Sequence, residues 1–387
     1  MNIAMLVHNP ARRGTYWRAY YLARELCRRG HRVALLHTAP AERRRFAVAY
    51  EEQGRLALVA APDLLAGGLR AGWDPWATLA RTTWLNSSHP DLVHAFECRP
   101  AVILPALAIA RQRRLPLVID WCDWFGRGGS VEERPNPLQR AALRPLETFF
   151  EERFRRYADA TTVINSVLGA KATALGVQPS TIYELPNGCS VEGWPTEGRD
   201  EARAALGLPL DAPILGYVGV IFARDAILLA AAFDRLRERC PAARLLVIGY
   251  CNIAIEDLVR DRAAVTRTGP LDTPTLQRYL RACDIGWAPL SDSGANRGRW
   301  PLKLSSYMEA GLPFVTTAVG DLADFLARHP AGLAAAPTPA AIAEASADLL
   351  TNPAHMAALG STGRRLAEGE LSWASVAARL ERIYHQL

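Results

Sequence analysis

Residues 284–317 read DIGWAPLSDSGANRGRWPLKLSSYMEAGLPFVTT, and this stretch decides the fold class. Two short apolar runs at its ends flank one amphipathic segment, which lies at 301–310. Pro301 suits the first position of a helix, and Gly311 suits the position just past its end. A strand, a helix and a second strand in this order are typical of a βαβ unit in a parallel sheet.

The same alternation of apolar runs and amphipathic stretches continues on both sides of this unit. A helix with Leu22 and Leu26 on one face is predicted before Gly30, because a spacing of four residues is helical. Continuously apolar runs such as 117–119 are typical of a sheet that is covered on both faces. In 331–347 the alanines and two prolines instead predict a loop that enters a surface helix. The predicted strands are Ile3–His8, Val33–Leu36, Leu56–Ala60, Leu92–Ala95, Leu117–Asp120, Thr162–Asn165, Ile214–Val220, Leu245–Ile248, Asp284–Ala288 and Phe314–Thr316.

A polar stretch near 190–212 interrupts the alternation once. We therefore predict two doubly wound, Rossmann-like α/β domains of similar size that face a central cleft. Their expected bounds are 1–195 and 196–370, and a last helix at 371–387 is expected to cross back to the first domain. In open α/β sheets ligands bind beyond the carboxyl ends of the strands, so the loops that follow strands are where sites are expected.

Composition excludes several classes of protein. The 387 residues are 50% hydrophobic and 22% charged, which is typical of a globular chain and not of a disordered one. No apolar run is long enough to span a bilayer, and the chain starts without a basic leader, which argues against an integral membrane protein and a signal peptide. Seven cysteines without a CxxC pair argue against a disulfide framework or a zinc site. We expect a cytoplasmic protein without a bound metal.

The positive charge of the chain is carried almost entirely by arginine. The net charge is +6, and only Lys171 and Lys303 are lysines among 45 basic residues. Small arginine clusters such as Arg43–Arg45 and Arg111–Arg114 could meet nucleic acid, an anionic membrane or phosphorylated substrates, and solvated surface is the simpler interpretation. Stacking aromatics do not alternate with these clusters, so we expect no nucleic-acid partner.

The start of the 301–310 helix is the strongest candidate site. The first N–H groups of a helix have no partner within it and carry the positive end of its dipole. Arg297, Arg299 and Lys303 cluster around this end, which is unfavourable unless an anion satisfies both. The pattern predicts a phosphate site, and a loop with solvated arginines is the alternative.

The segment Pro301-Leu-Lys303-Leu-x-x-Tyr-Met-x-Ala-Gly311-Leu-Pro313 resembles the donor-binding motif of family 4 retaining glycosyltransferases, which have the GT-B fold. Other pieces stand in the order of that family along essentially the whole chain. They are Gly14, Arg29-Gly-His-Arg-Val33, Asp91-Leu-Val-His94, Ala158-Asp-Ala160, Ser166, Pro186-Asn-Gly188, Tyr217-Val-Gly219, Gly249, Gly269, Asp284, Pro289 and Trp373.

The resemblance implies transfer of a sugar from a nucleotide diphosphate sugar to an acceptor hydroxyl, with retention of configuration and without a cofactor or metal. The first domain would be the acceptor side and the second would bind the nucleotide sugar. We assign catalytic roles to Lys303, Arg224 and Asp123. The expected donor-binding residues are Gly14, Gly219, Asn296, Arg297, Arg299, Leu304, Ser305 and Ser306. The expected acceptor-side residues are Asp120, Trp124 and His94, because carboxylates beside aromatic rings suit a sugar.

Two positions that usually carry glutamates in the family are Gly298 and Ser306 here. Ser306 could accept ribose hydrogen bonds only weakly. Glu309, one turn further along the same helix face, could substitute, although a solvated glutamate is the simpler interpretation. The loss of both carboxylates leaves open whether activity is lowered or abolished.

Two further sites depart from the family. Its basic pair early in the second domain aligns with Val220 and Asp225, so Arg224 would compensate and Asp225 could contact ligand hydroxyls. Cys122 stands where many members have a histidine near the reacting sugar, while Asp123 keeps the following acid. We therefore expect Asp123 to bind or deprotonate the acceptor.

Three other functions stay open. The chain could be a non-catalytic GT-B subunit that supports another transferase, a nucleotide-sugar 2-epimerase of the same architecture, or, on charge alone, a nucleic-acid-binding protein. The nucleotide, the sugar and the oligomeric state are also open. The acceptor is either a small molecule or linked to a lipid, and a lipid would bring the chain to the inner face of a membrane.

Overall fold

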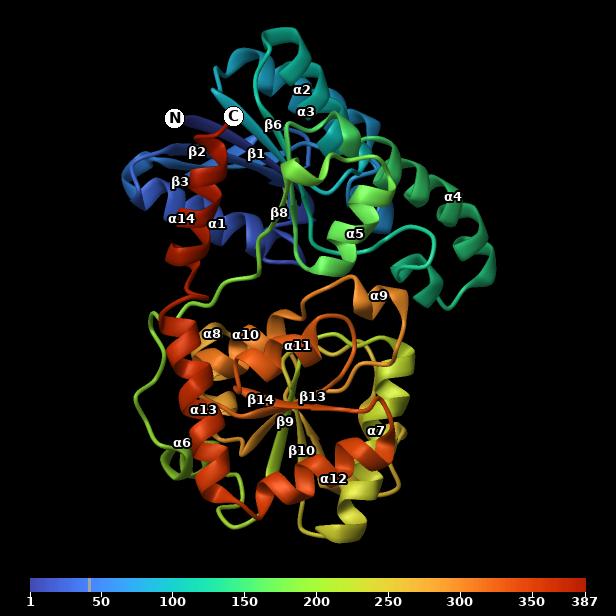
Figure 1. Cartoon of the computed structure of the whole chain (residues 1–387), viewed down its shortest axis with the longest axis vertical. Helices are drawn as coiled ribbons and strands as arrows, with labels where there is room; N and C mark the ends of the chain where they lie inside the picture. Colours follow the sequence, from blue (N-terminus) through green and yellow to red (C-terminus); the bar gives the residue numbers. More distant parts are fainter. Residues whose placement is uncertain (41–42) are drawn as a thin grey trace. The chain divides into compact units, whose positions relative to one another are not determined.

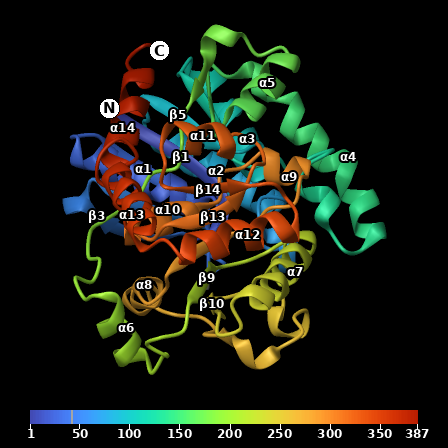
Figure 2. The same cartoon turned by 60° about the horizontal axis from the view of Figure 1, so that its bottom comes forward.

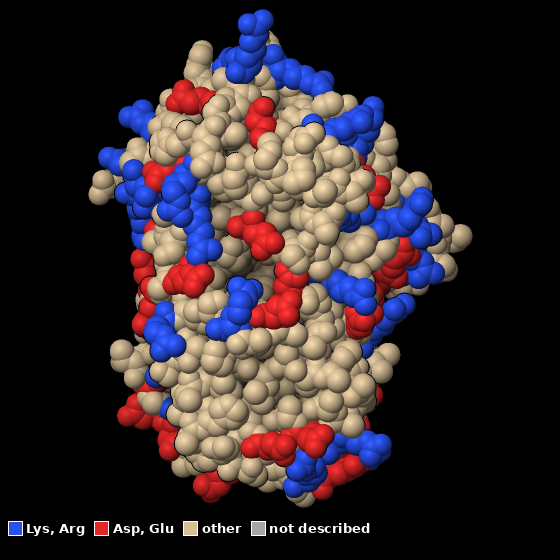
Figure 3. Space-filling model, viewed as in Figure 1, with Lys and Arg blue, Asp and Glu red and all other residues tan. Residues whose placement is uncertain are grey.

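The computed structural model describes residues 1–40 and 43–387, and its elements form two compact units (Figure 1). Unit 1 comprises Met1–Asn187, the short segment Gly298–Trp300 and the C-terminal Trp373–Leu387. Unit 2 comprises Gly188–Arg297 and Pro301–Ser372. Basic and acidic side chains are interspersed on the face that Figure 3 shows.

Unit 1 is built on an eight-stranded sheet with the order β3-β4-β2-β1-β5-β6-β7-β8. The strand pairs are parallel apart from β3, which runs antiparallel to β4 at the edge. The strands are β1 (Asn2–Pro10), β2 (Arg32–Thr38), β3 (Ala47–Glu51), β4 (Leu56–Ala61), β5 (Leu92–Phe96), β6 (Leu117–Trp121), β7 (Ala160–Val163) and β8 (Ile182–Glu184). The helices are α1 (Tyr16–Arg28), α2 (Pro75–Ser87), α3 (Pro100–Arg113), α4 (Pro137–Arg153), α5 (Ser166–Ala174) and α14 (Trp373–Tyr384).

Both faces of this sheet are covered, as its continuously apolar strands predict. Side chains alternate across a strand, so β1 sends Met5 to one core cluster and Leu6 to another. The first cluster includes the buried faces of α1 and α14, which lie side by side in both views (Figures 1 and 2). The second includes the buried face of α3.

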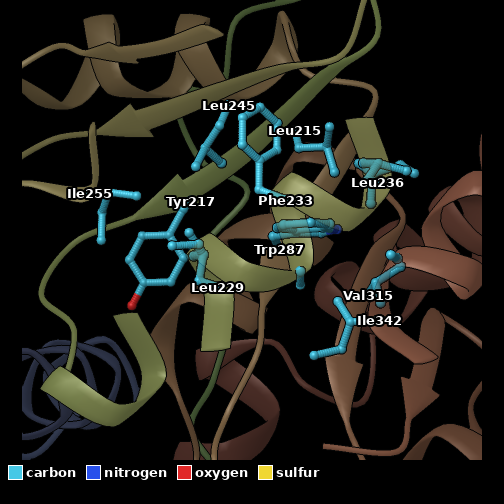
Figure 4. Packing of buried hydrophobic residues seen from close by; sticks show 14 of the residues in the cluster. Leu215, Tyr217, Leu229, Phe233, Leu236, Leu245, Ile255, Trp287, Val315 and Ile342 are labelled. Atoms are coloured by element: carbon cyan, nitrogen blue, oxygen red, sulfur yellow. The ribbon is translucent and has the colours of Figure 1, made fainter. Parts of the chain in front are cut away.

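Unit 2 is built on a six-stranded parallel sheet with the order β11-β10-β9-β12-β13-β14. Its core holds Trp287 against Phe233 at right angles, with Leu229 and Val315 nearby (Figure 4). The strands are β9 (Ile214–Val218), β10 (Arg244–Ile248), β11 (Val265–Arg267), β12 (Ile285–Ala288), β13 (Phe314–Thr317) and β14 (Gly332–Ala335). The helices are α6 (Arg199–Leu206), α7 (Ala223–Arg239), α8 (Thr273–Arg281), α9 (Gly294–Arg297), α10 (Leu302–Ala310), α11 (Leu322–Arg328), α12 (Pro339–Leu350) and α13 (Pro353–Glu368).

All ten predicted strands are present, with ends that shift by at most two residues. Short 3-10 turns that the sequence did not predict lie at Glu52–Gly54, Gly67–Arg70, Ser130–Glu133, Arg155–Tyr157, Pro179–Thr181, Ile255–Asp257 and Arg262–Ala264. The prediction of a loop at the start of 331–347 was wrong, because Gly332–Ala335 forms β14 beside β13. A Cβ on Gly332 would lie 2.3 Å from the Phe314 carbonyl oxygen, so this strand needs a glycine for its close approach.

The candidate helix at 301–310 is α10, which starts one residue later than predicted. Pro301 is its N-cap, in an extended conformation, and Gly311 ends it with φ +64°. Leu304, Tyr307 and Met308 form its buried stripe. Within residues 1–40 and 43–387, no helix is both long and apolar enough to cross a membrane.

Candidate functional site

The site in unit 2 lies where the strand order reverses. The chain runs from β9 to β10 on one side, and β12 pairs with β9 on the other side. Ligands of open α/β sheets bind beyond the carboxyl ends of the strands at such a point. Gly219 follows β9 with φ +81°, a conformation that favours glycine, and its N–H donates to the Ile248 carbonyl.

Lys303 extends from the first turn of α10 to the end of β9. Its Nζ lies 3.7 Å from the centre of the Tyr217 ring and donates hydrogen bonds to the Tyr217 hydroxyl and, at 3.4 Å, to the Val220 carbonyl. The Tyr217 hydroxyl in turn donates to the same carbonyl at 3.0 Å. The half-buried ammonium is thus held beside the N-terminus of α10, where the helix dipole is also positive.

A buried hydrogen-bond network positions the loop between β12 and α10. Asp225, in the first turn of α7, is 1% exposed. Its Oδ1 accepts from the Ser291 N–H at 2.8 Å, the Ser291 hydroxyl at 2.7 Å and the Asn296 amide at 2.8 Å. This Asp225 oxygen therefore holds the loop, and the expectation that Asp225 contacts ligand hydroxyls is not supported by its position. Asn296 is likewise buried in this network, and among the described residues its Oδ1 accepts no hydrogen bond.

The other predicted donor residues of unit 2 lie in different environments. Arg224 is exposed in the first turn of α7, and the exposed Arg297 forms an ion pair with Asp292 at 2.6 Å. Ser305 is buried, and Ser306 is half-buried. The prediction that Leu304 binds the donor is wrong. Its side chain is fully buried and its N–H donates to the Pro301 carbonyl, so Leu304 supports the helix.

Glu309 is partly exposed, and its carboxylate holds the backbone of a neighbouring segment. Its Oε1 accepts from the Ser190 N–H at 2.7 Å. Burial raises the pKa of Glu309 to about 7, although this hydrogen bond stabilises the ionised carboxylate and acts to lower the pKa. The residue therefore anchors the chain near the start of unit 2.

Unit 1 has its own reversal of strand order, between β1 and β5. Gly14 follows β1 with φ +53°, and a Cβ there would come within 2.7 Å of the Asn9 amide nitrogen. A glycine is therefore needed at this turn, which stays the predicted place for close approach to a phosphate.

The prediction that Asp120 and His94 lie on the acceptor side is wrong, because both side chains are buried in the interior of unit 1. Asp120 is fully buried and forms a bidentate ion pair with Arg18 at 2.9 and 3.0 Å. Burial favours the neutral acid, but the charge and hydrogen bond of Arg18, with smaller contributions from His94 and Thr162, together lower the pKa of Asp120. His94 is also fully buried, and its Nδ1 lies 2.6 Å from the Tyr384 hydroxyl of α14. Both side chains stabilise unit 1.

Asp123 and Trp124 follow β6 and are partly exposed. Burial raises the pKa of Asp123 to about 6, although the Arg299 guanidinium opposes this shift. The Trp124 indole donates to the Arg127 carbonyl at 3.0 Å, and Lys171 Nζ lies 4.7 Å from its ring. A Cβ on Gly129 would lie 2.2 Å from the Trp124 carbonyl oxygen, so the glycine-rich stretch lets the loop fold back on this residue.

Sequence reasoning missed two glutamates that hold this loop. Glu97, after β5, is 1% exposed and has φ +70°, and its carboxylate accepts the Cys122 N–H. Glu151, on α4, is 4% exposed and accepts the Phe125 N–H. The only sequence feature that could have marked Glu97 as a functional residue is its position directly after an apolar strand. Burial, with the Glu97 charge, raises the pKa of the Cys122 thiol well above its usual value, so Cys122 stays neutral.

Across 1–40 and 43–387, no group of three or more His, Cys, Asp or Glu side chains is placed to hold a metal ion.

Two family descriptions match the chain over separate spans. "Glycosyl transferase 4-like domain" matches residues 13–188, and "Glycosyl transferases group 1" matches residues 212–352. The first span lies in unit 1 apart from Gly188, and the second lies in unit 2 apart from Gly298–Trp300.

Curated relatives carry the same kind of name. D-inositol 3-phosphate glycosyltransferase 1 of Catenulispora acidiphila is 25% identical over 76% of this chain and 72% of its own length. D-inositol 3-phosphate glycosyltransferase of Kineococcus radiotolerans is 28% identical over 54% of this chain, which spans 53% of that relative.

Solved structures share the fold. Sucrose-phosphate synthase from Thermosynechococcus elongatus has a TM-score of 0.77 at 20% identity, over 100% of this chain and 98% of its own. WaaG, a glycosyltransferase of lipopolysaccharide biosynthesis, has a TM-score of 0.71 at 17% identity, over 98% and 99%. HepE of Anabaena, solved with UDP-glucose, has a TM-score of 0.70 at 14% identity, over 100% of both chains. At these identities the likeness establishes the GT-B architecture.

The two domain matches, the names of the relatives and the architecture agree: the chain is a glycosyltransferase of the GT-B fold, and it is similar to family 4.

Proposed function

We propose that the chain transfers a sugar from a nucleoside diphosphate sugar to an acceptor hydroxyl, with retention of configuration and without a metal ion or other cofactor. The observation that carries this proposal is the fixed ammonium of Lys303 at the start of α10, beside Tyr217 and the Val220 carbonyl. A cation, a helix N-terminus and a glycine turn at a strand reversal are together suited to a diphosphate. The HepE complex with UDP-glucose makes UDP a reasonable first probe.

The chemistry requires negative charge to be stabilised as the bond between the sugar and the diphosphate breaks. An ammonium held in place before the reaction stabilises that charge without reorganising in the transition state. Lys303 and the N–H groups at the start of α10 would supply this charge in place of a metal. Arg224, Arg297 and Arg299 are the further cations that we assign to the donor.

The test is an analysis of products from a panel of nucleotide sugars and acceptors. Retention predicts that nuclear magnetic resonance finds the same anomeric configuration in product and donor. Metal independence predicts an unchanged rate after EDTA treatment. An inverted product or a rate abolished by EDTA and restored by Mg²⁺ would contradict the corresponding part of the proposal.

A non-catalytic subunit is the second candidate, and the replacement of the family glutamates by Gly298 and Ser306 favours it. Such a subunit would bind a nucleotide sugar saturably without transfer or hydrolysis. The same product analysis also reveals an epimerase, because an epimerised donor would appear in the absence of any acceptor.

On the acceptor side, we assign Asp123 the role of accepting the proton of the acceptor hydroxyl. Because burial raises the pKa of Asp123 to about 6, kcat/KM should fall as the pH decreases through about 6 and the base becomes protonated. Asp123→Asn should lower kcat/KM by about 100-fold and remove this acidic limb. A pH–rate profile of both proteins checks the prediction. An acidic limb that persists unchanged in the variant would exclude Asp123 as the base.

We also propose that the chain contacts an anionic bilayer to reach a lipid-linked acceptor. The supporting feature is the α4 apolar face, which consists of Leu138, Ala141, Ala142, Pro145, Leu146 and Phe149. These residues recur at helical spacing and are exposed, whereas the buried side chains of α4 are the acids Glu147 and Glu151. Arg140, Arg144 and Arg153 flank the face, and cations beside an exposed apolar stripe are complementary to anionic lipid.

Leu138→Glu/Phe149→Glu should weaken binding to phosphatidylcholine–phosphatidylglycerol vesicles by at least about tenfold, because both apolar anchors become charged. Co-sedimentation measures this binding. Leu64→Glu is the matched control, since Leu64 is 68% exposed in unit 1 outside the α4 apolar face. Equal binding by the double variant and the control would contradict the membrane contact.

A further inference from the structure

Four backbone N–H groups of the loop that follows β6 donate to carboxylates rather than to other backbone groups. Glu97 Oε1 accepts the N–H of Cys122 at 2.8 Å and that of Asp123 at 3.2 Å. The same oxygen lies 3.3 Å from the Cys122 sulfur, which is itself 3.6 Å from the Thr15 hydroxyl. Cys122, which Glu97 holds, thus joins the loop after β6 to the turn after β1.

Glu151 receives the next part of the loop from α4. Its Oε1 accepts the Phe125 N–H at 2.7 Å and the Trp121 indole N–H at 3.1 Å, and its Oε2 accepts the Gly126 N–H at 2.7 Å. Both oxygens of this side chain are therefore used. Together the two glutamates accept four backbone N–H groups between residues 122 and 126.

Arg155 is the cation shared by this arrangement. It donates to Glu97 Oε2 at 3.0 Å and to the Glu151 main-chain carbonyl at 2.9 Å, and its guanidinium lies 3.7 Å from the Trp121 ring centre. Burying two carboxylates with one guanidinium is unfavourable unless every oxygen is hydrogen-bonded. The left-handed backbone of Glu97 adds further strain. Apolar side chains would stabilise the strand ends more simply, so what the carboxylates add is a defined loop backbone.

We propose that Glu97 and Glu151 are positioning residues that orient Asp123 toward the acceptor by fixing the backbone of 122–126. This inference rests on the proposed role of Asp123. Asp123 lies in the middle of the held segment, with one Glu97 hydrogen bond to its own N–H. A glutamine at 151 would have to turn an NH₂ group toward either the Phe125 or the Gly126 N–H, so only a carboxylate satisfies both.

The first experiment measures the loop without any ligand. In Glu151→Gln, hydrogen exchange of the Phe125 and Gly126 amides should become about tenfold faster, because a charge-assisted hydrogen bond is lost. Glu147→Gln is the matched control: Glu147 is also buried on α4, but its carboxylate pairs with Arg134 at 2.6 Å and with Arg99 at 3.7 Å. Unchanged exchange in Glu151→Gln, or equal acceleration in both variants, overturns the proposal.

The second experiment is a double-mutant cycle on UDP-glucose hydrolysis, with water as the acceptor and UDP release as the readout. Glu151→Gln should lower kcat by about tenfold. In the Asp123→Asn background the same change should cause little further loss, because Glu151 acts only by positioning the Asp123 carboxylate, which is already removed. A purely structural role predicts multiplied losses and overturns the proposal. If Glu151→Gln does not fold, Glu97→Gln completes the same cycle and the same exchange measurement at Cys122 and Asp123.

The two claims fail differently. If Asp123→Asn hydrolyses UDP-glucose at the wild-type rate, the proposed function of Asp123 is wrong. If Asp123→Asn is impaired while Glu151→Gln and Glu97→Gln keep the wild-type kcat, the positioning inference alone is wrong. If the wild type does not hydrolyse UDP-glucose, hydrogen exchange still decides whether the carboxylates hold the loop.

Discussion

Lys303→Ala should lower kcat by about 30- to 1000-fold, which corresponds to a loss of about 2–4 kcal/mol of transition-state stabilisation. The reason is that Lys303 Nζ is held before the reaction by Tyr217 and the Val220 carbonyl, at the positive end of α10. A charge held in this way acts on the leaving diphosphate more strongly in the transition state than in the bound donor. Steady-state kinetics of nucleotide release with saturating donor measures the effect.

Two further variants serve as comparisons for this prediction. Arg260→Ala removes a 73% exposed cation of unit 2 and should leave kcat unchanged, because it lies on the surface in an ion pair with Glu238. Lys303→Arg keeps the charge but not the compact ammonium, so its kcat should lie between those of the wild type and Lys303→Ala. A Lys303→Ala protein with a kcat within about threefold of the wild type would remove the basis for the donor site.

Asp120→Ala should destabilise the protein by about 3–5 kcal/mol, the largest effect on stability that we expect from one substitution. Arg18 is 2% exposed, and both its ion pair and its bond to the Leu185 carbonyl at 2.8 Å lie in the interior. Removing Asp120 leaves this guanidinium buried without its counter-charge, and the Thr162 hydroxyl loses its acceptor at 2.6 Å. Urea unfolding followed by circular dichroism measures the change.

The matched comparison is an exposed ion pair. Glu238→Ala, in the exposed Arg235–Glu238 pair of α7, should change the free energy of unfolding by less than about 1 kcal/mol. Arg18→Met/Asp120→Leu should be more stable than Asp120→Ala, because it removes both charges and keeps an apolar volume. A loss below about 1 kcal/mol in Asp120→Ala would show that the pair is not buried as described.

The fold was predictable where sequence features are local. Continuously apolar runs marked the central strands, and Pro301 with Gly311 marked α10 to within one residue. Strands without such a pattern were missed. Residues 47–51 of β3 lie at a sheet edge and are mostly exposed, so they show no apolar run, and β14 is short and made of glycine, leucine and alanine.

In the candidate site, too, features that depend on neighbouring residues were predictable, and features that depend on distant residues were not. Gly14 and Gly219 adopt positive φ and Lys303 lies at a helix start, and these properties depend on neighbours in the sequence. The burial of Asp120 depends on Arg18, which is 102 residues away, and that of His94 on Tyr384, 290 residues away. An acid or histidine at the end of a strand looks the same in the sequence whether it faces a ligand or a distant partner.

The central claim is that the N-terminus of α10 receives the diphosphate of the donor. A crystal structure with bound UDP tests it most directly. The account predicts that a phosphate oxygen lies within hydrogen-bonding distance of Lys303 Nζ and of the first N–H groups of α10. Electron density that places the diphosphate away from Lys303, with the ammonium still on Tyr217 and Val220, would contradict it.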